Sequence, residues 1–129
     1  MLAAEITAVC KKDPGELYTA LAAELGHSLY RRSEAAATEE QKAALEHITA
    51  KDIHAADLAG ERPITIATKA AGDGSSIGGI KVAAANGWFA ARPSGTEAIY
   101  KIYAESFKSE AHLQAVVEQA QEIVIAALA

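Results

Sequence analysis

The sequence predicts an α+β domain in which a group of strands is enclosed by helices. Apolar residues recur with the period of an α-helix near both ends of the chain, but alternate with a period of two between residues 64 and 106. Short turn signals separate the alternating segments, as expected for strands that pair with their sequence neighbours. Strands grouped between helices are typical of a mostly antiparallel sheet with helices packed on it.

Two short helices are expected at the start of the chain. Residues 2–12 carry apolar side chains on one helical stripe. A second helix is expected to begin at Asp13, because Asp13 and Glu16 have the spacing of a capping box. Gly26 suits the residue that ends this helix.

Residues 27–37 show no clear period and are interpreted as a connector. Thr38 and Gln41 then form a second capping-box pattern, which predicts a further helix. The expected organisation is therefore a helical lead-in at residues 1–34, followed by one domain at residues 35–129.

The next part of the chain predicts a sheet. After a loop that contains Pro63, four strands are expected, at residues 64–68, 80–84, 88–92 and 98–106. Asn86 and Gly87 tolerate positive φ and predict a tight hairpin between the second and third strands. Trp88 is expected in the core. Ser109 can cap a final helix, whose apolar residues form one stripe.

Composition excludes several classes of function. The net charge of −5 argues against nucleic-acid binding, which usually needs a basic surface. Cys10 is the single cysteine, so the chain can form neither an internal disulfide nor a cysteine-based metal cluster. No apolar run reaches the length of a membrane span. A cytoplasmic protein without membrane or nucleic-acid partners is expected.

The loop from Arg92 to Glu97 concentrates hydrogen-bond donors suited to an anion. Arg92 offers a planar charged fork, and Ser94 and Thr96 add hydroxyl groups. Gly95 lacks a Cβ, so neighbouring backbone N–H groups could turn inward around a phosphate. The residues alone favour a plain tight turn with Arg92 and Lys101 as solvated surface charges, because Ser-Gly-Thr turns are common.

A resemblance favours the first interpretation. The segments that carry it are Arg92-Pro93-Ser94-Gly95-Thr96-Glu97 with Tyr100-Lys101-Ile102-Tyr103, Ile77-Gly78-Gly79-Ile80-Lys81-Val82, Asn86-Gly87-Trp88-Phe89-Ala90 and Gln41-Lys42-Ala43-Ala44-Leu45. The first resembles the phosphate-binding loop of the α-D-phosphohexomutase superfamily, and the others are similar to its bacterial phosphoglucomutase branch. The resemblance implies a C-terminal domain with a TATA-binding-protein-like fold.

By motif match, the resemblance assigns the substrate phosphate to Arg92, Ser94, Gly95 and Thr96, with Lys101 on the following strand. Glu97 is expected to point away from the phosphate, toward a basic neighbour, because two anions repel each other. The resemblance also places the lead-in helices at the end of a preceding domain, whose sheet is absent from this sequence.

The implied parent reaction interconverts glucose 1-phosphate and glucose 6-phosphate through glucose 1,6-bisphosphate. Family members use a phosphoserine, a Mg²⁺ loop and a sugar-reading loop, and none of these motifs occurs here. No catalytic residue, metal ligand or cofactor is therefore expected in this chain, which would need the missing N-terminal domains as partners. Open alternatives are a mannose or glucosamine phosphate mutase, and a non-enzymatic α+β interaction module.

Overall fold

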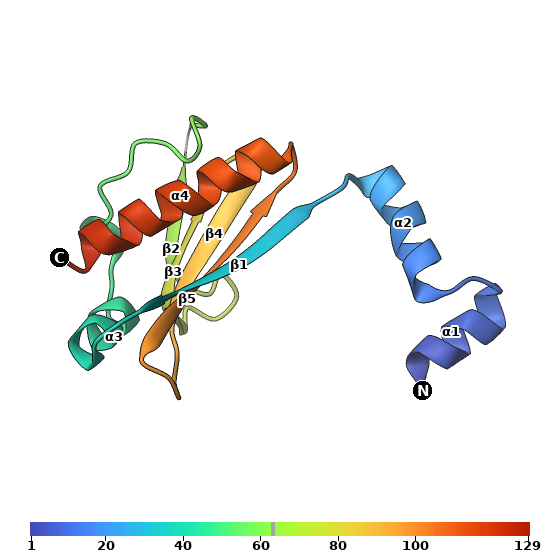
Figure 1. Ribbon diagram of the computed structural model, residues 1–129, viewed down its shortest axis with the longest axis horizontal. Coiled ribbons are helices and arrows are strands. Elements are labelled where there is room, and N and C mark those ends of the chain that lie inside the picture. Colours follow the sequence, from blue (N-terminus) through green and yellow to red (C-terminus); the bar gives the residue numbers. More distant parts are fainter. Residues whose placement is uncertain (63) are drawn as a thin grey trace.

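A five-stranded antiparallel sheet forms the centre of the computed structural model, which describes residues 1–62 and 64–129 (Figure 1). The order of strands across the sheet is β1-β5-β4-β3-β2, and each neighbouring pair is antiparallel. The predicted α+β class is thus confirmed. Pro63 lies outside the described residues. The strands are β1 (Leu29–Ala36), β2 (Thr65–Lys69), β3 (Ser76–Ala83), β4 (Gly87–Pro93) and β5 (Ile99–Ser106).

The sheet contains one strand more than the sequence predicts. The prediction that residues 27–37 are a connector is wrong, because β1 pairs with β5 from Leu29 opposite Ser106 to Ala36 opposite Ile99. β1 is an edge strand that carries Arg31, Arg32 and Glu34. Backbone hydrogen bonds to β5 stabilise it, and a hydrophobic pattern does not record such bonds.

Local turn and cap chemistry explains most element boundaries. The predicted β3–β4 hairpin is present, and the Ala84 N–H donates to the Gly87 carbonyl at 2.8 Å. Its turn lies at Ala85 and Asn86, because Gly87 is already the first residue of β4, and neither Asn86 nor Gly87 adopts the positive φ on which the prediction rested. The capping boxes predicted at Asp13 and Thr38 are both present. The helices are α1 (Leu2–Cys10), α2 (Pro14–Leu25), α3 (Glu39–Glu46), the 3₁₀ helix η1 (Ala50–Asp52) and α4 (Glu110–Ala127).

The hydrophobic core lies between one face of the sheet and the helices α4 and α3. α4 begins at the predicted cap Ser109, whose hydroxyl accepts from the His112 N–H at 3.1 Å. In Figure 1 it crosses the sheet. The largest fully buried side chains of the core are Phe89, Leu45, Leu58, Ile80, Ile102, Leu113, Val82, Val116 and Val124.

Trp88 is not part of this core. Phe89 occupies the core face of β4, and the adjacent Trp88 therefore points to the opposite face, since neighbouring residues of a strand alternate. There the indole N–H donates to a Glu105 carboxylate oxygen at 2.8 Å, and the Lys81 ammonium lies 4.7 Å from the ring centroid. The prediction of a core tryptophan is corrected accordingly.

Helices α1 and α2 lie apart from the sheet and from α3 and α4 (Figure 1). Several of their apolar side chains are exposed, among them Leu2, Val9, Leu21 and Leu25. No helix within residues 1–62 and 64–129 combines the length and hydropathy that crossing a membrane requires.

Candidate functional site

Arg92 stands near the end of β4, directly opposite Lys101 of β5. Its side chain runs past two glycines of the neighbouring strand β3. A Cβ added to Gly79 would lie 3.0 Å from Arg92 Cγ, and one added to Gly78 would lie 4.0 Å from Arg92 Nη2. Gly79 therefore leaves open the channel along which the Arg92 side chain extends, whereas a Cβ at Gly78 would make only an ordinary van der Waals contact with the guanidinium.

The Arg92 side chain reaches a cavity of about 410 Å³ between α3 and the loop that follows β4. A volume of this order suits a small ligand. Three of the five residues predicted to bind phosphate, Arg92, Ser94 and Gly95, line it together. The complete lining is Glu39, Lys42, Ala43, Glu46, Gly78, Arg92, Pro93, Ser94 and Gly95.

The loop after β4 is closed by its own backbone. The Ser94 N–H donates to the Ile99 carbonyl at 2.9 Å, so this amide is already engaged in the free chain. The Ser94 side chain is buried, at 5% exposed. Gly95 is open to solvent, with no heavy atom within 4 Å of a Cβ built on it. Thr96 is exposed and lies outside the described lining of the cavity.

Glu97 links two of the predicted site residues. Its Oε2 atom accepts from Lys101 Nζ at 3.2 Å and from Ser94 Oγ at 3.4 Å. The expected basic neighbour of Glu97 is therefore Lys101, itself one of the predicted phosphate ligands. Lys101, like Thr96, does not line the cavity within the described part of the chain.

Arg92 differs from the other three arginines of the chain, because it has no acidic partner among residues 1–62 and 64–129. Arg31 pairs with Glu110, Arg32 with Glu34, and Arg62 with Asp57. Within the described residues, the Arg92 guanidinium forms no ion pair and no side-chain hydrogen bond. An exposed guanidinium that faces a cavity without a carboxylate partner is available for an external anion.

Three further residues, Lys42, Gly78 and Gly79, contact the site or its arginine and were not predicted from the sequence. Lys42 is three residues before the fully buried Leu45, so it lies on the sheet-facing side of α3. The sequence pattern that could have identified Lys42 is a lysine on an otherwise apolar stripe of a predicted helix. The glycine pair had no such signal, because its role depends on the register between β3 and β4.

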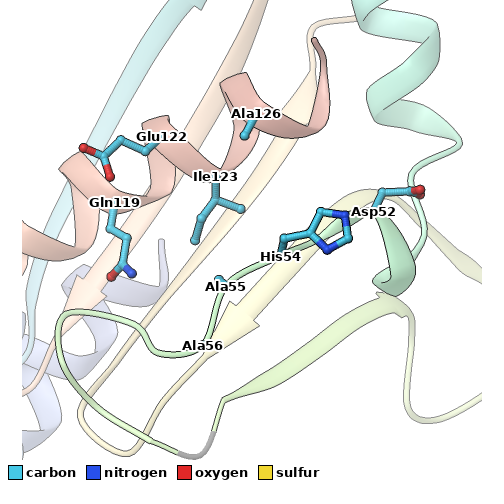
Figure 2. A pocket seen from close by; sticks show the side chains of 8 residues that line it. All are labelled: Asp52, His54, Ala55, Ala56, Gln119, Glu122, Ile123 and Ala126. Carbon is cyan, nitrogen blue, oxygen red and sulfur yellow. The ribbon is translucent and has the colours of Figure 1, made fainter.

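A second cavity contains carboxylates without a lysine or arginine to balance them in its described lining. It measures about 280 Å³ and lies beside the last turns of α4 (Figure 2). Asp52 and Glu122 contribute carboxylates to its wall, and neither lysine nor arginine lines it within the described residues. Carboxylates repel a phosphate dianion, so this cavity is a poor candidate for phosphate binding.

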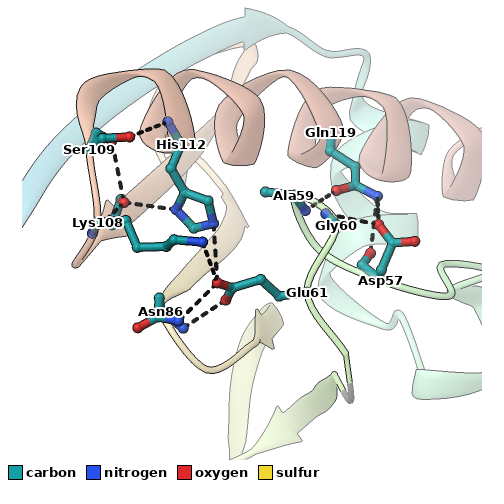
Figure 3. A network of polar contacts seen from close by, with 10 residues as sticks. Asp57, Ala59, Gly60, Glu61, Asn86, Lys108, Ser109, His112 and Gln119 are labelled. Carbon is teal, nitrogen blue, oxygen red and sulfur yellow. Dashed lines mark hydrogen bonds and ion pairs between the residues drawn. The ribbon is translucent and has the colours of Figure 1, made fainter.

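A third polar cluster, centred on Glu61, is saturated by internal contacts (Figure 3). The Asn86 side-chain and backbone N–H groups donate to its two carboxylate oxygens at 2.9 and 2.8 Å, and Lys108 Nζ donates at 3.2 Å. The hydrogen bonds from Asn86, followed by the contact with Lys108, lower the pKa of Glu61 to about 2. This cluster ties the β3–β4 turn to the start of α4.

The described residues do not provide a metal site. They contain no group of three or more histidine, cysteine, aspartate or glutamate side chains arranged to hold an ion. Mg²⁺ prefers octahedral coordination by oxygen ligands, and the residues present do not fit it.

Two comparisons with known proteins relate this fold to a family. Residues 31–123 match the family model for the phosphoglucomutase/phosphomannomutase C-terminal domain. The whole chain is 51% identical, over 129 residues, to the phosphoglucomutase of Komagataeibacter xylinus, and it spans 23% of the length of that protein. The matched region contains most of β1, the other four strands, α3, most of α4 and the loop after β4. The chain therefore belongs to the phosphoglucomutase/phosphomannomutase family, as a representative of its C-terminal domain.

Proposed function

We propose that this chain binds the phosphate group of a phosphorylated hexose in the cavity beside Arg92. The observation that carries the proposal is the arginine itself, which has no carboxylate partner among the described residues and lines a cavity with a buried hydroxyl, Ser94. A guanidinium fork can hold two phosphate oxygens at once. Ser94 and Gly95 would supply a hydroxyl and an unhindered backbone approach.

Thr96 and Lys101 would join the site when ligand is present. Lys101 is held 3.2 Å from Glu97 in the free chain, and its ammonium would turn toward the phosphate once the ligand adds a stronger negative charge. Glu97 would then retain its contact with Ser94 and keep that side chain in place. Arg92, Ser94 and Gly95 would thus form the site in the free chain, and Thr96 and Lys101 would complete it when the phosphate binds.

The role of this binding in a longer protein is also part of the proposal. The parent enzyme would interconvert glucose 1-phosphate and glucose 6-phosphate through glucose 1,6-bisphosphate. This chain would hold the phosphate that is not reacting, which positions the other end of the sugar for transfer. Because β1 belongs to the sheet, the boundary expected after residue 34 moves forward: residues 29–129 would form the phosphate-binding domain, and residues 1–28 the end of the preceding domain. The preceding domains would be its partners in the cytoplasm.

The chemical step would depend on groups outside this chain. A phosphoserine and Mg²⁺ would supply phosphoryl transfer and charge neutralisation in the parent enzyme. The residues described here do not fit a metal ion, so no step is assigned to them beyond holding and orienting a phosphate. The chain alone is expected to show no mutase turnover in a coupled assay with Mg²⁺ and glucose 1,6-bisphosphate.

A titration with glucose 1-phosphate tests the proposal. With an open cavity, the dissociation constant should be on the order of 1 mM, which corresponds to about −4 kcal/mol. Arg92→Ala should weaken binding by at least about tenfold, because a charged hydrogen-bonded contact is lost. Arg62→Ala is the matched control, since Arg62 is paired with Asp57 and does not line the cavity.

Further ligands separate the alternatives. Mannose 1-phosphate should bind nearly as well as glucose 1-phosphate, because the site contacts the phosphate and not the sugar ring. An oligonucleotide that binds more tightly than both sugars would favour the interaction module instead. Equal affinities of Arg92→Ala and the unmodified chain would contradict the assignment of the site.

A further inference from the structure

We propose that Lys42 of α3 is a second cationic ligand of the bound phosphate, which it contacts from the wall of the cavity opposite the loop after β4. This inference rests on the proposed function of that cavity. Lys42 lines the cavity together with Arg92, Ser94 and Gly95, although it precedes Arg92 by 50 residues in the sequence. No motif in the loop itself points to this residue.

The burial of Lys42 is unusual for a lysine. Its side chain is 14% exposed, whereas that of its ion-pair partner Glu39 is 79% exposed. Lys42 shares the sheet-facing side of α3 with the fully buried Leu45. Lysine is seldom held so far from water without a reason, because its ammonium group is strongly hydrated. A lysine can bury its aliphatic stem and keep its ammonium at the surface, and Lys42 does so at the edge of the cavity that it lines.

The present partner of Lys42 holds it only weakly. Lys42 Nζ lies 3.1 Å from Glu39 Oε1, one helical turn earlier. Ion pairs with a mostly exposed carboxylate contribute little to stability. Replacement of that carboxylate by a phosphate therefore costs little free energy. Glu39 therefore acts as a stand-in for the ligand, and keeps the lysine in the cavity when no anion is bound.

Charge balance gives a second reason for this role. Glu39 and Glu46 both line the cavity, and with Arg92 as the only cation its walls would carry a net negative charge. A phosphate monoester carries up to two negative charges and would then be repelled. Lys42 neutralises this excess and leaves the guanidinium free for the ligand. A compact ammonium and a planar fork also suit different phosphate oxygens.

The test is a titration of the 129-residue chain with inorganic phosphate and with glucose 1-phosphate, at constant ionic strength. Lys42→Met keeps the apolar stem and removes the charge. It should weaken binding of both ligands by about fivefold to tenfold, as expected for loss of one charge-assisted hydrogen bond. Lys51→Met is the matched control, because Lys51 is exposed on η1 and does not line the cavity. It should bind like the unmodified chain.

Glu39→Gln gives a prediction of opposite sign. Removal of the competing carboxylate should strengthen phosphate binding by about twofold to threefold, because Lys42 is released and a repulsive charge disappears. Glu39 is exposed at the first turn of α3, so this variant should fold normally. Lys42→Arg, which keeps the charge, should recover part of the affinity lost in Lys42→Met.

The outcomes separate the two proposals. If Arg92→Ala loses binding while Lys42→Met and Lys51→Met both bind normally, the role of Lys42 is overturned and the proposed function stands. If phosphate does not bind the unmodified chain, or if Arg92→Ala binds normally, both proposals fall. If Lys42→Met fails to fold, the Glu39→Gln titration decides, and unchanged or weaker binding by that variant overturns the role of Lys42.

Discussion

The two ends of the central sheet carry similar side chains but use them differently. At the hairpin end, around Asn86, the carboxylate of Glu61 is surrounded by donors and each of its contacts is internal. At the opposite end, the loop after β4 brings Arg92 to a cavity without an acidic partner among the described residues. The first cluster locks the fold together, and the second leaves a charge available for a ligand.

This difference is a better guide to function than the presence of charged residues. The strongly lowered pKa of Glu61 marks a group whose charge is satisfied by Asn86 and Lys108. Perturbed pKa values occur at functional sites, but also in structural networks such as this one. Arg92 differs in its contacts, because it faces open space and a hydroxyl and pairs with no carboxylate among the described residues, although Glu39 and Glu46 also line the cavity. Variants at each end should therefore affect different properties.

The largest effect is expected for Gly79→Ala at the cavity end. The added Cβ would lie 2.1 Å from the Ala91 carbonyl oxygen and 3.0 Å from Arg92 Cγ, so the β3–β4 pair would have to shift. We expect a loss of about 3 kcal/mol in unfolding free energy, at the upper end for overpacking, together with weaker phosphate binding. Urea unfolding measures the first effect, and a phosphate titration the second.

Gly95→Ala provides the control for that variant. A Cβ on Gly95 meets no heavy atom within 4 Å, so the free energy of unfolding should stay within about 0.5 kcal/mol of the unmodified value. Equal stability of the two alanine variants would show that the glycine channel beside Arg92 does not depend on close backbone packing.

The next largest effect is expected for Glu61→Gln at the hairpin end. This change weakens the contacts with Asn86 and Lys108 in a largely buried cluster, and should cost about 2 kcal/mol of unfolding free energy. Affinity for glucose 1-phosphate should be unchanged in the folded protein. A loss of affinity comparable to that of Arg92→Ala would break the distinction between the two ends.

The pH dependence of stability should report on the same cluster. The pKa of Glu61 is about 2 in the folded chain, below its ordinary value of 4.5. Because the folded pKa is the lower one, the carboxylate contributes stability that is fully present above pH 4.5 and is lost as the pH falls toward 2. Urea unfolding at a series of pH values should show this loss. In the Glu61→Gln variant, the part of this acid-dependent loss that comes from Glu61 should be absent.

A smaller effect is expected for Ser94→Ala. The Ser94 hydroxyl lies 3.4 Å from Glu97, a long contact, and the backbone N–H remains bound to Ile99 without the side chain. Binding of glucose 1-phosphate should weaken by about twofold to fivefold, in line with loss of one neutral hydrogen bond. A calorimetric titration can resolve this change. An effect larger than that of Arg92→Ala would mean that the hydroxyl, not the guanidinium, dominates the site.

The smallest effect is expected for removal of residues 1–27. Helices α1 and α2 lie apart from the sheet, and both ends of the sheet are built from residues after Leu29 (Figure 1). The deletion should change neither the phosphate affinity nor the unfolding free energy by more than about 0.5 kcal/mol.

In the intact chain, amide hydrogen exchange should be fast in α1 and α2 and slow in β5 and α4. Strong protection of α1 would show that these helices are stabilised by contacts of another kind.

Local sequence chemistry was sufficient to predict most of the fold. Side chains that cap helices, such as Asp13, Thr38 and Ser109, act within four residues and are visible as short patterns. The Asn86–Gly87 hairpin is local in the same sense. β1 was missed because its stability comes from backbone pairing with a strand about 70 residues later in the chain.

The candidate site could be predicted only in part, for the same physical reason. Arg92, Ser94 and Gly95 occur in one loop, and a motif identifies them together. Lys42 and Gly79 join the site through the packing of α3 and the register of β3, which short motifs do not encode. Alternation in β4 likewise did not indicate that Phe89 faces the core and Trp88 the opposite side.

The most direct test of this account is an amide-resolved NMR titration with glucose 1-phosphate. The account predicts that shifts concentrate at Arg92, Ser94, Gly95 and Thr96, with smaller ones at Lys101, and that they weaken as salt is added. Glu61 and its neighbours at the hairpin end should not respond. Shifts that concentrate around Glu61, or beside the acidic cavity of Figure 2, would contradict the assignment of the binding end of the sheet.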